Sequence, residues 1–366
     1  MKRAIYNFIT TKQSGFLPTL FRILLIPFSW LYGTVILARN YCYTIGLFKQ
    51  KQLACTVISV GNIVVGGTGK TPATAAIARL LKNRGYRMAL ILSGYKRHSN
   101  DAVTIVSDGR NRLCSRKEGG DEADMLARQL TDIPIVVGKQ RYLAGKTALN
   151  RLKSEILIID DGFQHRQLAR DIDIVTIDAT QPCGTGALLP IGTLREPISA
   201  LQRADIILLT RTDADNINII DLKTELNQFA QNTPILQSVH QPTSLYWLNQ
   251  KENQDALPLT TLTGKRLLAV CGIGNPDAFV TTLKKYQPEA IELFAFPDHH
   301  VYTKPDLFHI QQRMQRCHAE WVITTQKDEQ KLRVFSAELP IIVLAVELII
   351  TDGEAILLTA IQKALE

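Results

Sequence analysis

The sequence predicts an α/β protein with two domains that follow an apolar and basic N-terminal segment. Its 366 residues exceed the usual size of a single domain. From residue 52 onward, short apolar runs alternate with stretches of helical periodicity, a pattern typical of βαβ units on a parallel sheet. Residues 235–265 are polar and interrupted by proline, which indicates a linker or an irregular pair of strands between two such regions.

We therefore expect three parts in the chain. They are a hydrophobic and basic segment at 1–51, a larger parallel-sheet domain at 52–240 and a smaller α/β domain at 241–366. Hydrophobic residues make up 46% of the chain and charged residues 21%, an ordinary composition for a protein with a packed core.

The elements of both domains follow from apolar runs and helix-end signals. The strands expected in the larger domain are 55–60, 87–93, 134–138, 155–161, 173–178 and 205–213. A helix is expected at 71–83, because Pro72 suits a first helical turn and Gly85 suits a helix end. In the smaller domain the apolar runs are 267–279, 319–328 and 339–346.

The N-terminal part carries sixteen uncharged and mostly apolar residues at 23–38, with a basic residue on either side. Crossing a bilayer takes about 20 apolar residues, and Pro27 interrupts this run. Aromatic residues gather at its edges, as in segments that lie on a membrane surface. No small-residue cleavage site follows, so we do not expect a secretory signal. The alternative is a buried helical hairpin of a soluble core.

Charge is distributed unevenly along the chain. No Asp or Glu precedes Asp101, whereas the first hundred residues hold fourteen Lys and Arg. Such asymmetry predicts a polyanionic partner. We expect an anionic membrane surface and no nucleic acid, because binding a nucleic acid would not require the apolar bulk of the same segment. The six cysteines form no CxxC pair, so cysteine-bound metal is not expected.

A glycine-rich stretch, GNIVVGGTGKTP at 61–72, lies between an expected strand and an expected helix. It resembles a phosphate-binding loop except that Val64 replaces the first glycine of the pattern. Backbone N–H groups of such a loop cradle phosphates, and the lysine reaches the β- and γ-phosphates of ATP. The larger domain is thus predicted to be P-loop NTPase-like. The expected nucleotide-binding residues are Gly66, Gly67, Thr68, Gly69, Lys70 and Thr71.

Two adjacent acids, Asp160 and Asp161, end the apolar run at 155–161. P-loop proteins hold Mg²⁺ with the loop hydroxyl, here that of Thr71, and an acid at the end of a strand. Ligands of open parallel sheets lie at that edge. Mg²⁺ is therefore the expected metal. The alternative is an ordinary Asp-Gly turn.

Seven stretches of the chain resemble the tetraacyldisaccharide 4′-kinase family of lipid A biosynthesis. They are SVGNIVVGGTGKTP (59–72), GGDEADMLA (119–127), DDGFQHR (160–166), GALLPIGTLREP (186–197), CGIGNP (271–276), FPDHH (296–300) and TTQKD (324–328). The resemblance implies transfer of phosphate from ATP to the 4′-hydroxyl of tetraacyldisaccharide 1-phosphate. It also implies a peripheral or monotopic location at the cytoplasmic face of the bacterial inner membrane.

The same resemblance implies roles for individual residues. It puts the catalytic base on Asp121, assisted by His299 and acting with Lys70. It puts Gln164 with Thr71, Asp160 and Asp161 in the metal group. Residues expected near phosphate, substrate or the nucleotide base are Arg195, Glu196, Lys327 and Asp328. Without the resemblance, Asp121 would read as a helix cap and His299 as a surface or core histidine.

The chain departs from the family pattern at three positions. Ser93 stands where the family commonly has Arg, and Lys96 or Arg97 could compensate. Ala123 replaces a usual Pro, and Gln326 replaces a usual Glu.

Two other functions compete with the kinase. The first is a membrane-associated P-loop switch ATPase, whose loop carries an extra lysine where this chain has Val65. The second is a lipid-binding scaffold that merely holds a nucleotide.

Overall fold

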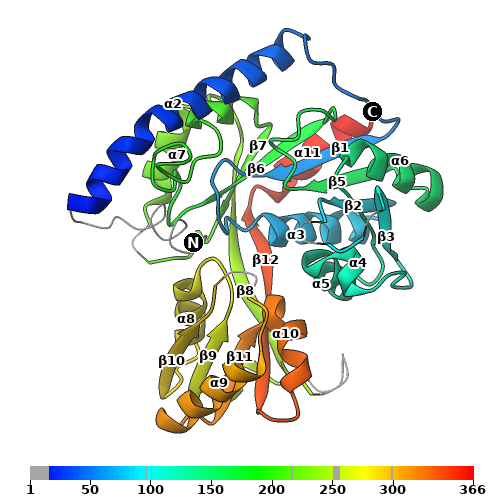
Figure 1. The fold of residues 1–366 in the computed structure, drawn as a ribbon. Coiled ribbons are helices and arrows are strands. Elements are labelled where there is room, and N and C mark those ends of the chain that lie inside the picture. The colour runs from blue at the N-terminus through cyan, green and yellow to red at the C-terminus, as the bar shows by residue number, and fades with distance from the viewer. Residues whose placement is uncertain (1–15, 95–96, 100, 216, 250–255, 298–299) are drawn as a thin grey trace. The chain divides into compact units, whose positions relative to one another are not determined.

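The structure, a computed structural model, describes residues 16–94, 97–99, 101–215, 217–249, 256–297 and 300–366. The chain forms two compact units (Figure 1). Unit 1 comprises Met1–Val239 together with Leu348–Glu366, and unit 2 comprises His240–Glu347. The chain therefore leaves unit 1 once and returns to it at the C-terminus. The domain ranges expected from sequence differ from these units, because the expected second domain, 241–366, includes residues 348–366.

Unit 1 is built on a mostly parallel sheet. Its strands lie in the order β8-β7-β6-β1-β5-β2-β4-β3. They are β1 (Thr56–Gly61), β2 (Met88–Leu92), β3 (Val103–Asp108), β4 (Pro134–Gly138), β5 (Ile156–Asp160), β6 (Ile172–Asp178), β7 (Ile206–Thr210) and β8 (Ile235–Trp247). Only β3, at the edge, is antiparallel among the strand pairs described in this unit. The α/β fold expected from the alternating apolar runs is confirmed.

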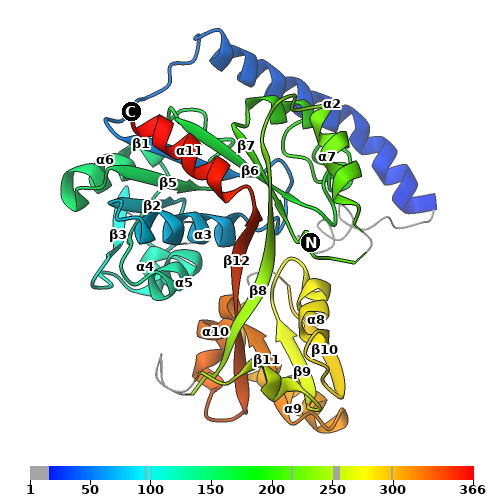
Figure 2. The same cartoon turned by 180° about the vertical axis from the view of Figure 1, so that it is seen from behind.

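Helices cover both faces of this sheet, because its strands are apolar on both sides. One face packs against α3 (Lys70–Asn83), α5 (Asp121–Gln129) and α11 (Glu354–Leu365). The other face packs against α6 (Arg141–Leu152) and, further along the sheet, α7 (Ile219–Asn227). Figure 2 shows α11 crossing strands of unit 1. The short helix α4 (Arg116–Gly119) directly precedes α5.

Unit 2 is a second α/β unit with the strand order β10-β9-β11-β12-β8. Its further strands are β9 (Arg266–Cys271), β10 (Ala290–Ala295), β11 (Trp321–Thr325) and β12 (Ile341–Asp352), and its helices are α8 (Pro276–Lys284), α9 (Lys304–Arg316) and α10 (Gln326–Leu332). The stretch at 235–265 was expected to be irregular. It instead begins with the thirteen-residue strand β8, in which Leu236 and Ser238 are buried while Ile235 and Gln237 are only partly buried, the alternation that a strand requires.

The apolar run at 23–38 lies within one long helix, α2 (Phe16–Thr44), and does not form a hairpin. Pro27 lies inside this helix and does not end it, contrary to the expectation from sequence. By length and composition Arg22–Thr44 is one candidate membrane span among the described residues, although such a helix near an N-terminus is weak support for crossing. Only 11% of its apolar window is buried, which argues against a buried core hairpin.

The C-terminal helix completes the core of unit 1. Leu357 and Ile361 on α11 are almost fully buried beside the strands, whereas Ile356 on the same helix is 48% exposed. Thr56 on β1 donates a hydrogen bond to the carbonyl of Ala364 at 3.1 Å.

We expect Ile361→Ala to lower the free energy of unfolding of unit 1 by about 2–5 kcal/mol, because it leaves a cavity in a packed core. The matched variant Ile356→Ala should change it by less than about 1 kcal/mol, since that side chain is already in water. Urea denaturation of the two full-length variants measures both values. Equal effects would show that α11 does not pack as described.

Candidate active site

The glycine-rich loop joins β1 to α3 at the carboxyl edge of the sheet. Gly69 has φ of +82° and directly precedes α3, a left-handed conformation that glycine adopts without strain. The following N–H groups at the start of α3 are therefore open to an anion. Val64 makes an antiparallel bridge with Leu194, so the position that lacks the usual glycine is held by a neighbouring segment.

Asp160 binds the start of α3 through two hydroxyl groups. Thr71 Oγ1 donates to one carboxylate oxygen at 3.0 Å, and Thr74 Oγ1 donates to the other, also at 3.0 Å. Asp160 lies opposite Val60 in the pairing of β5 with β1, which brings it beside the loop. Burial raises the pKa of this carboxyl, and the neighbouring Asp161 adds to the effect.

Asp161 turns away from the strand direction and faces cations. Its φ of +54° is unusual for a residue other than glycine and costs on the order of 1–3 kcal/mol. Arg195 donates to both of its carboxylate oxygens, at 2.6 and 3.3 Å, and Lys70 Nζ lies 3.9 Å away. Burial alone would raise the pKa of Asp161, but Arg195 and Lys70 hold it below its usual range.

Lys70 is the cation at the centre of this group. Its Nζ lies 3.5 Å from the carbonyl of Gly66, within the loop itself. Burial lowers the pKa of the ammonium, and the nearby carboxylates of Asp161, Asp160 and Glu122 oppose that shift. The lysine is thus mostly desolvated and close to the space the loop encloses.

Polar side chains behind the loop fix its shape. Asn62 donates to the carbonyl of Val64 at 2.6 Å and to Thr68 Oγ1 at 2.8 Å. Thr210 donates to the carbonyl of Thr68 at 3.1 Å. These contacts explain how the loop keeps its form without its first glycine.

The donors at this edge fit a magnesium ion. Mg²⁺ prefers oxygen ligands and is commonly held by one or two carboxylates together with substrate phosphates. Thr71 and Asp160 already lie together, and Gln164 donates to the carbonyl of Asn62 at 2.8 Å. The other amide atom of that glutamine, Oε1, is buried without a partner among the described residues. An unsatisfied buried acceptor of this kind suits a ligand or an ordered water.

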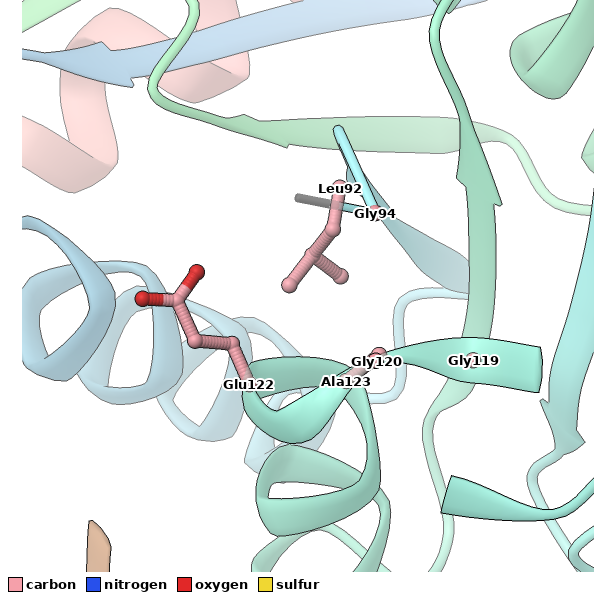
Figure 3. Close-up of a pocket in the computed structure, with 6 residues that line it drawn as sticks. All are labelled: Leu92, Gly94, Gly119, Gly120, Glu122 and Ala123. Carbon is pink, nitrogen blue, oxygen red and sulfur yellow. The ribbon is translucent and has the colours of Figure 1, made fainter. Parts of the chain in front are cut away.

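Acidic residues begin α5 next to this site. Asp121 is the first residue of the helix and receives a hydrogen bond from Arg116 Nε at 2.7 Å. The residue in the cap position is Gly120, so the alternative that Asp121 caps this helix is not what the structure has. Glu122 is close enough to Lys70 to stabilise its charge. In Figure 3 Glu122 and Leu92 extend into a small pocket between the end of β2 and the start of α5.

Arg141 is a residue of the site that the sequence analysis did not predict. It begins α6 directly after β4, is only 7% exposed and donates to the carbonyl of Gly138 at 3.2 Å. Asp161 and Asp160 stabilise its charge, although burial lowers its pKa. The rule that parallel strands end at one common edge, applied to PIVVGKQR, would have placed this cation beside the acids.

Other expected residues lie elsewhere. Glu196 is fully buried, and its carboxylate is bound by Asn40 on α2 and by Arg203, not by the loop. Asp328, in unit 2, is also fully buried and bonds to the N–H of Gly272 at 2.7 Å and to Lys331 at 3.3 Å. Lys327 is partly buried on the same helix, α10.

Two expectations from the sequence concern residues outside the described ranges. His299 is one of them, and Lys96 is the other. Arg97, the other residue considered as a substitute for the missing arginine at Ser93, donates to Thr104 Oγ1 at 2.9 Å. Arg97 is therefore engaged with β3.

Comparisons with known proteins agree on one family. The sequence model of the family described as tetraacyldisaccharide-1-P 4′-kinase matches residues 21–366. A tetraacyldisaccharide 4′-kinase from Syntrophus aciditrophicus is 43% identical over 319 residues, which cover 85% of this chain and 84% of that protein. The kinase of the same name from Halothermothrix orenii is 39% identical over 309 residues, or 82% and 80% of the two chains.

A solved structure is also similar over nearly the whole chain. It is a crystal structure of LpxK from Aquifex aeolicus in complex with ATP. It is 31% identical in sequence, has a TM-score of 0.75, and the match covers 94% of this chain and 100% of that one.

A partly buried imidazole adjoins the site. His165 follows the acid pair in the DDGFQHR stretch, and burial together with Arg141 and Arg170 lowers its pKa to about 4. In an unfolded chain a histidine has a pKa of about 6.5. Between these values the unfolded chain binds the proton and the folded chain does not. The contribution of neutral His165 to the free energy of unfolding is therefore present above pH 6.5 and is lost as the pH falls toward 4.

We expect His165→Gln to remove this part of the acid sensitivity. The wild-type protein should lose more stability than the variant between pH 6.5 and pH 4.5, measured as the denaturant midpoint at each pH. His309→Gln, at an exposed position on α9, is the control and should follow the wild type. Parallel curves for the wild type and His165→Gln would contradict the prediction.

Proposed function

Because this chain belongs to the tetraacyldisaccharide-1-phosphate 4′-kinase family, we propose that it transfers the γ-phosphate of ATP to the 4′-hydroxyl of tetraacyldisaccharide 1-phosphate. The observation that carries the proposal is the grouping of Lys70, Thr71 and the Asp160–Asp161 pair around one glycine loop. That grouping lies within a family match that runs from residue 21 to the last residue.

The loop supplies the nucleotide site. Backbone N–H groups of Gly66 to Thr71 surround the phosphates, and the dipole of α3 favours their negative charge. Lys70 adds a desolvated positive charge where the γ-phosphate would lie. Thr71, Asp160, Asp161 and Gln164 would hold Mg²⁺ in this proposal. When bound, the ion neutralises the charge that develops on the phosphate oxygens.

Arg195 gives the site a second cation with a fixed direction. Its guanidinium is held by both oxygens of Asp161 and also donates to Asn62 Oδ1 at 3.2 Å. A guanidinium held in this way is preorganised to stabilise a transferring phosphoryl group. Asp161 in turn keeps Lys70 and Arg195 on one side of the acid pair.

Asp121 is the proposed acceptor of the proton from the sugar hydroxyl. It lies at the start of a helix, is about one third exposed and is held by Arg116. A sugar hydroxyl has a high pKa and needs a positioned base as phosphoryl transfer proceeds. We propose that His299, which lies outside the described residues, assists this base. Lys327 and Asp328 are proposed to act near the nucleotide base, Asp328 by fixing the main chain of Gly272.

The acylated substrate requires the enzyme to meet a lipid surface. The outward side of α2 presents large apolar residues that are more than half exposed, among them Leu24, Phe28, Trp30, Leu31 and Val35. Such a face, with basic residues nearby, fits an anionic membrane surface. We propose a peripheral or monotopic location on the cytoplasmic face of the inner membrane and no role in nucleic-acid binding.

The kinase is favoured over the switch ATPase by the loop itself. Switch ATPases carry an extra lysine at the position of Val65, and Val65 is an apolar side chain that is 37% exposed. It offers no ammonium to a nucleotide.

The proposed reaction is tested with purified protein, ATP, Mg²⁺ and tetraacyldisaccharide 1-phosphate in detergent. The wild type should yield the bisphosphorylated lipid. Asp121→Asn should lower kcat by about 10²- to 10⁴-fold while ATP still binds, because the base is lost. Lys70→Ala should lower kcat by about 10²-fold or more.

Asp132→Asn is the control for the loss of a carboxylate and should retain wild-type kcat. Asp132 is 71% exposed and pairs with Lys82. ATP hydrolysis by the wild type without phosphorylation of the lipid would overturn the kinase proposal.

Membrane binding is tested by introducing acids on α2. Leu24→Glu with Leu31→Glu should weaken sedimentation with vesicles that contain anionic phospholipid by more than about tenfold, because two exposed apolar side chains are lost from the lipid contact. Ile356→Glu, at an exposed position of α11, makes the same chemical change elsewhere and should not alter vesicle binding.

A further inference from the structure

The helix α2 has its polar contacts on the side that faces the protein. Ser29 is buried and donates to the carbonyl of Leu188 at 3.0 Å. Gly33 is also buried, and a Cβ there would lie 2.9 Å from Leu188, so the helix backbone approaches this segment closely. A helix that merely dissolved in lipid would need no such set of directed contacts on one side.

Two hydrogen bonds of α2 fall on consecutive residues of the LREP stretch. The hydroxyl of Tyr32 donates to the main-chain carbonyl of Arg195 at 2.8 Å. Two turns further on, the amide of Asn40 donates to the carboxylate of Glu196 at 2.7 Å. The helix therefore holds both the main chain of Arg195 and the side chain of its neighbour.

Glu196 is a fully buried carboxylate with several partners. Besides Asn40, Arg203 lies 3.1 Å and Arg39 3.7 Å from its oxygens. A buried charge of this kind is costly unless its partners are fixed. Oε1 of this carboxylate is already without a hydrogen bond among the described residues, so loss of Asn40 removes the hydrogen bond to Oε2 and loosens the residue next to Arg195.

The same stretch is bonded to the phosphate loop. The N–H of Arg195 donates to the carbonyl of Ile63 at 2.7 Å, and the N–H of Val65 donates to the carbonyl of Thr193 at 2.7 Å. On the other side, the Arg195 side chain binds Asp161. A continuous set of contacts thus leads from Tyr32 and Asn40 to the loop and the acid pair.

We propose that Tyr32 and Asn40 of α2 are positioning residues for phosphoryl transfer, because they hold the Arg195–Glu196 segment against the phosphate loop. The helix that meets the lipid surface thereby also sets the direction of the Arg195 guanidinium. The proposal deepens the kinase function and rests on it for the turnover readout. It predicts that loss of these contacts lowers kcat even when binding to membranes is intact.

The test compares Tyr32→Phe and Asn40→Ala with two controls on the same helix. Tyr41→Phe removes a hydroxyl from an outward tyrosine that is 64% exposed, and Thr34→Ala removes a polar group from the exposed side. Each hydrogen bond lost at Tyr32 or Asn40 should lower kcat by about three- to tenfold. Vesicle sedimentation and the KM for the lipid should stay at wild-type values, and kcat is normalised to sites titrated with a non-hydrolysable ATP analogue.

A second measurement does not depend on turnover. Hydrogen–deuterium exchange on the full-length protein should become faster at the amides of Arg195 and Val65 in Tyr32→Phe and Asn40→Ala, and stay unchanged in both controls. Wild-type exchange at these amides, together with kcat equal to the controls, would overturn the proposal and leave α2 as an anchor alone.

The kinase proposal and this inference fail separately. A wild-type protein that does not phosphorylate the lipid refutes the first, whereas the exchange rates still decide whether α2 holds the segment. A kcat loss that is matched by an equal loss of vesicle binding would also count against positioning.

Discussion

The site depends on two carboxylates that follow one another at the end of β5, Asp160 buried and Asp161 with its side chain 38% exposed. Two adjacent acids would repel each other at this depth, and desolvation disfavours both charges. The structure separates them by a left-handed turn at Asp161, which directs Asp160 to the hydroxyls of α3 and Asp161 to Arg195 and Lys70. One acid is then bonded by neutral groups and the other by cations. The contacts of Asp160 fix the start of α3, and the contacts of Asp161 fix Lys70 of the loop and Arg195 of the LREP stretch.

Much of the fold could be predicted from sequence because its strands are buried on both faces. Runs such as ILIID and IILLT lie in the middle of a parallel sheet, where apolar residues are continuous, and they were recognised as strands. The edge strand β3 was missed, since VTIVSD is short and mixed in polarity. Helix α11 was assigned to the wrong unit because nothing in its local pattern tells which sheet it will cover. That choice is made by Leu357 and Ile361 in tertiary packing.

The site was predictable to the extent that its chemistry follows local motifs. Lys70, Thr71 and the acid pair lie next to sequence signals that specify strand, turn and helix. Arg141 and the role of Glu196 could not be found in this way, because each depends on a partner more than a hundred residues away or on a different strand end. The side of α2 that faces the protein was likewise not predictable, since only the contacts of Tyr32 and Asn40 show it.

The return of the chain to unit 1 has a consequence for its synthesis. Unit 2 is complete once Glu347 has been made, whereas unit 1 is begun first and finished last. Domains form during translation as their residues emerge, N-terminal ones first. Here the strands around the phosphate loop leave the ribosome early but lack Leu357 and Ile361 until the final helix follows. The nascent protein therefore leaves part of this apolar sheet face uncovered through the translation of unit 2, and a message truncated anywhere in that interval gives a chain whose first core lacks these two side chains.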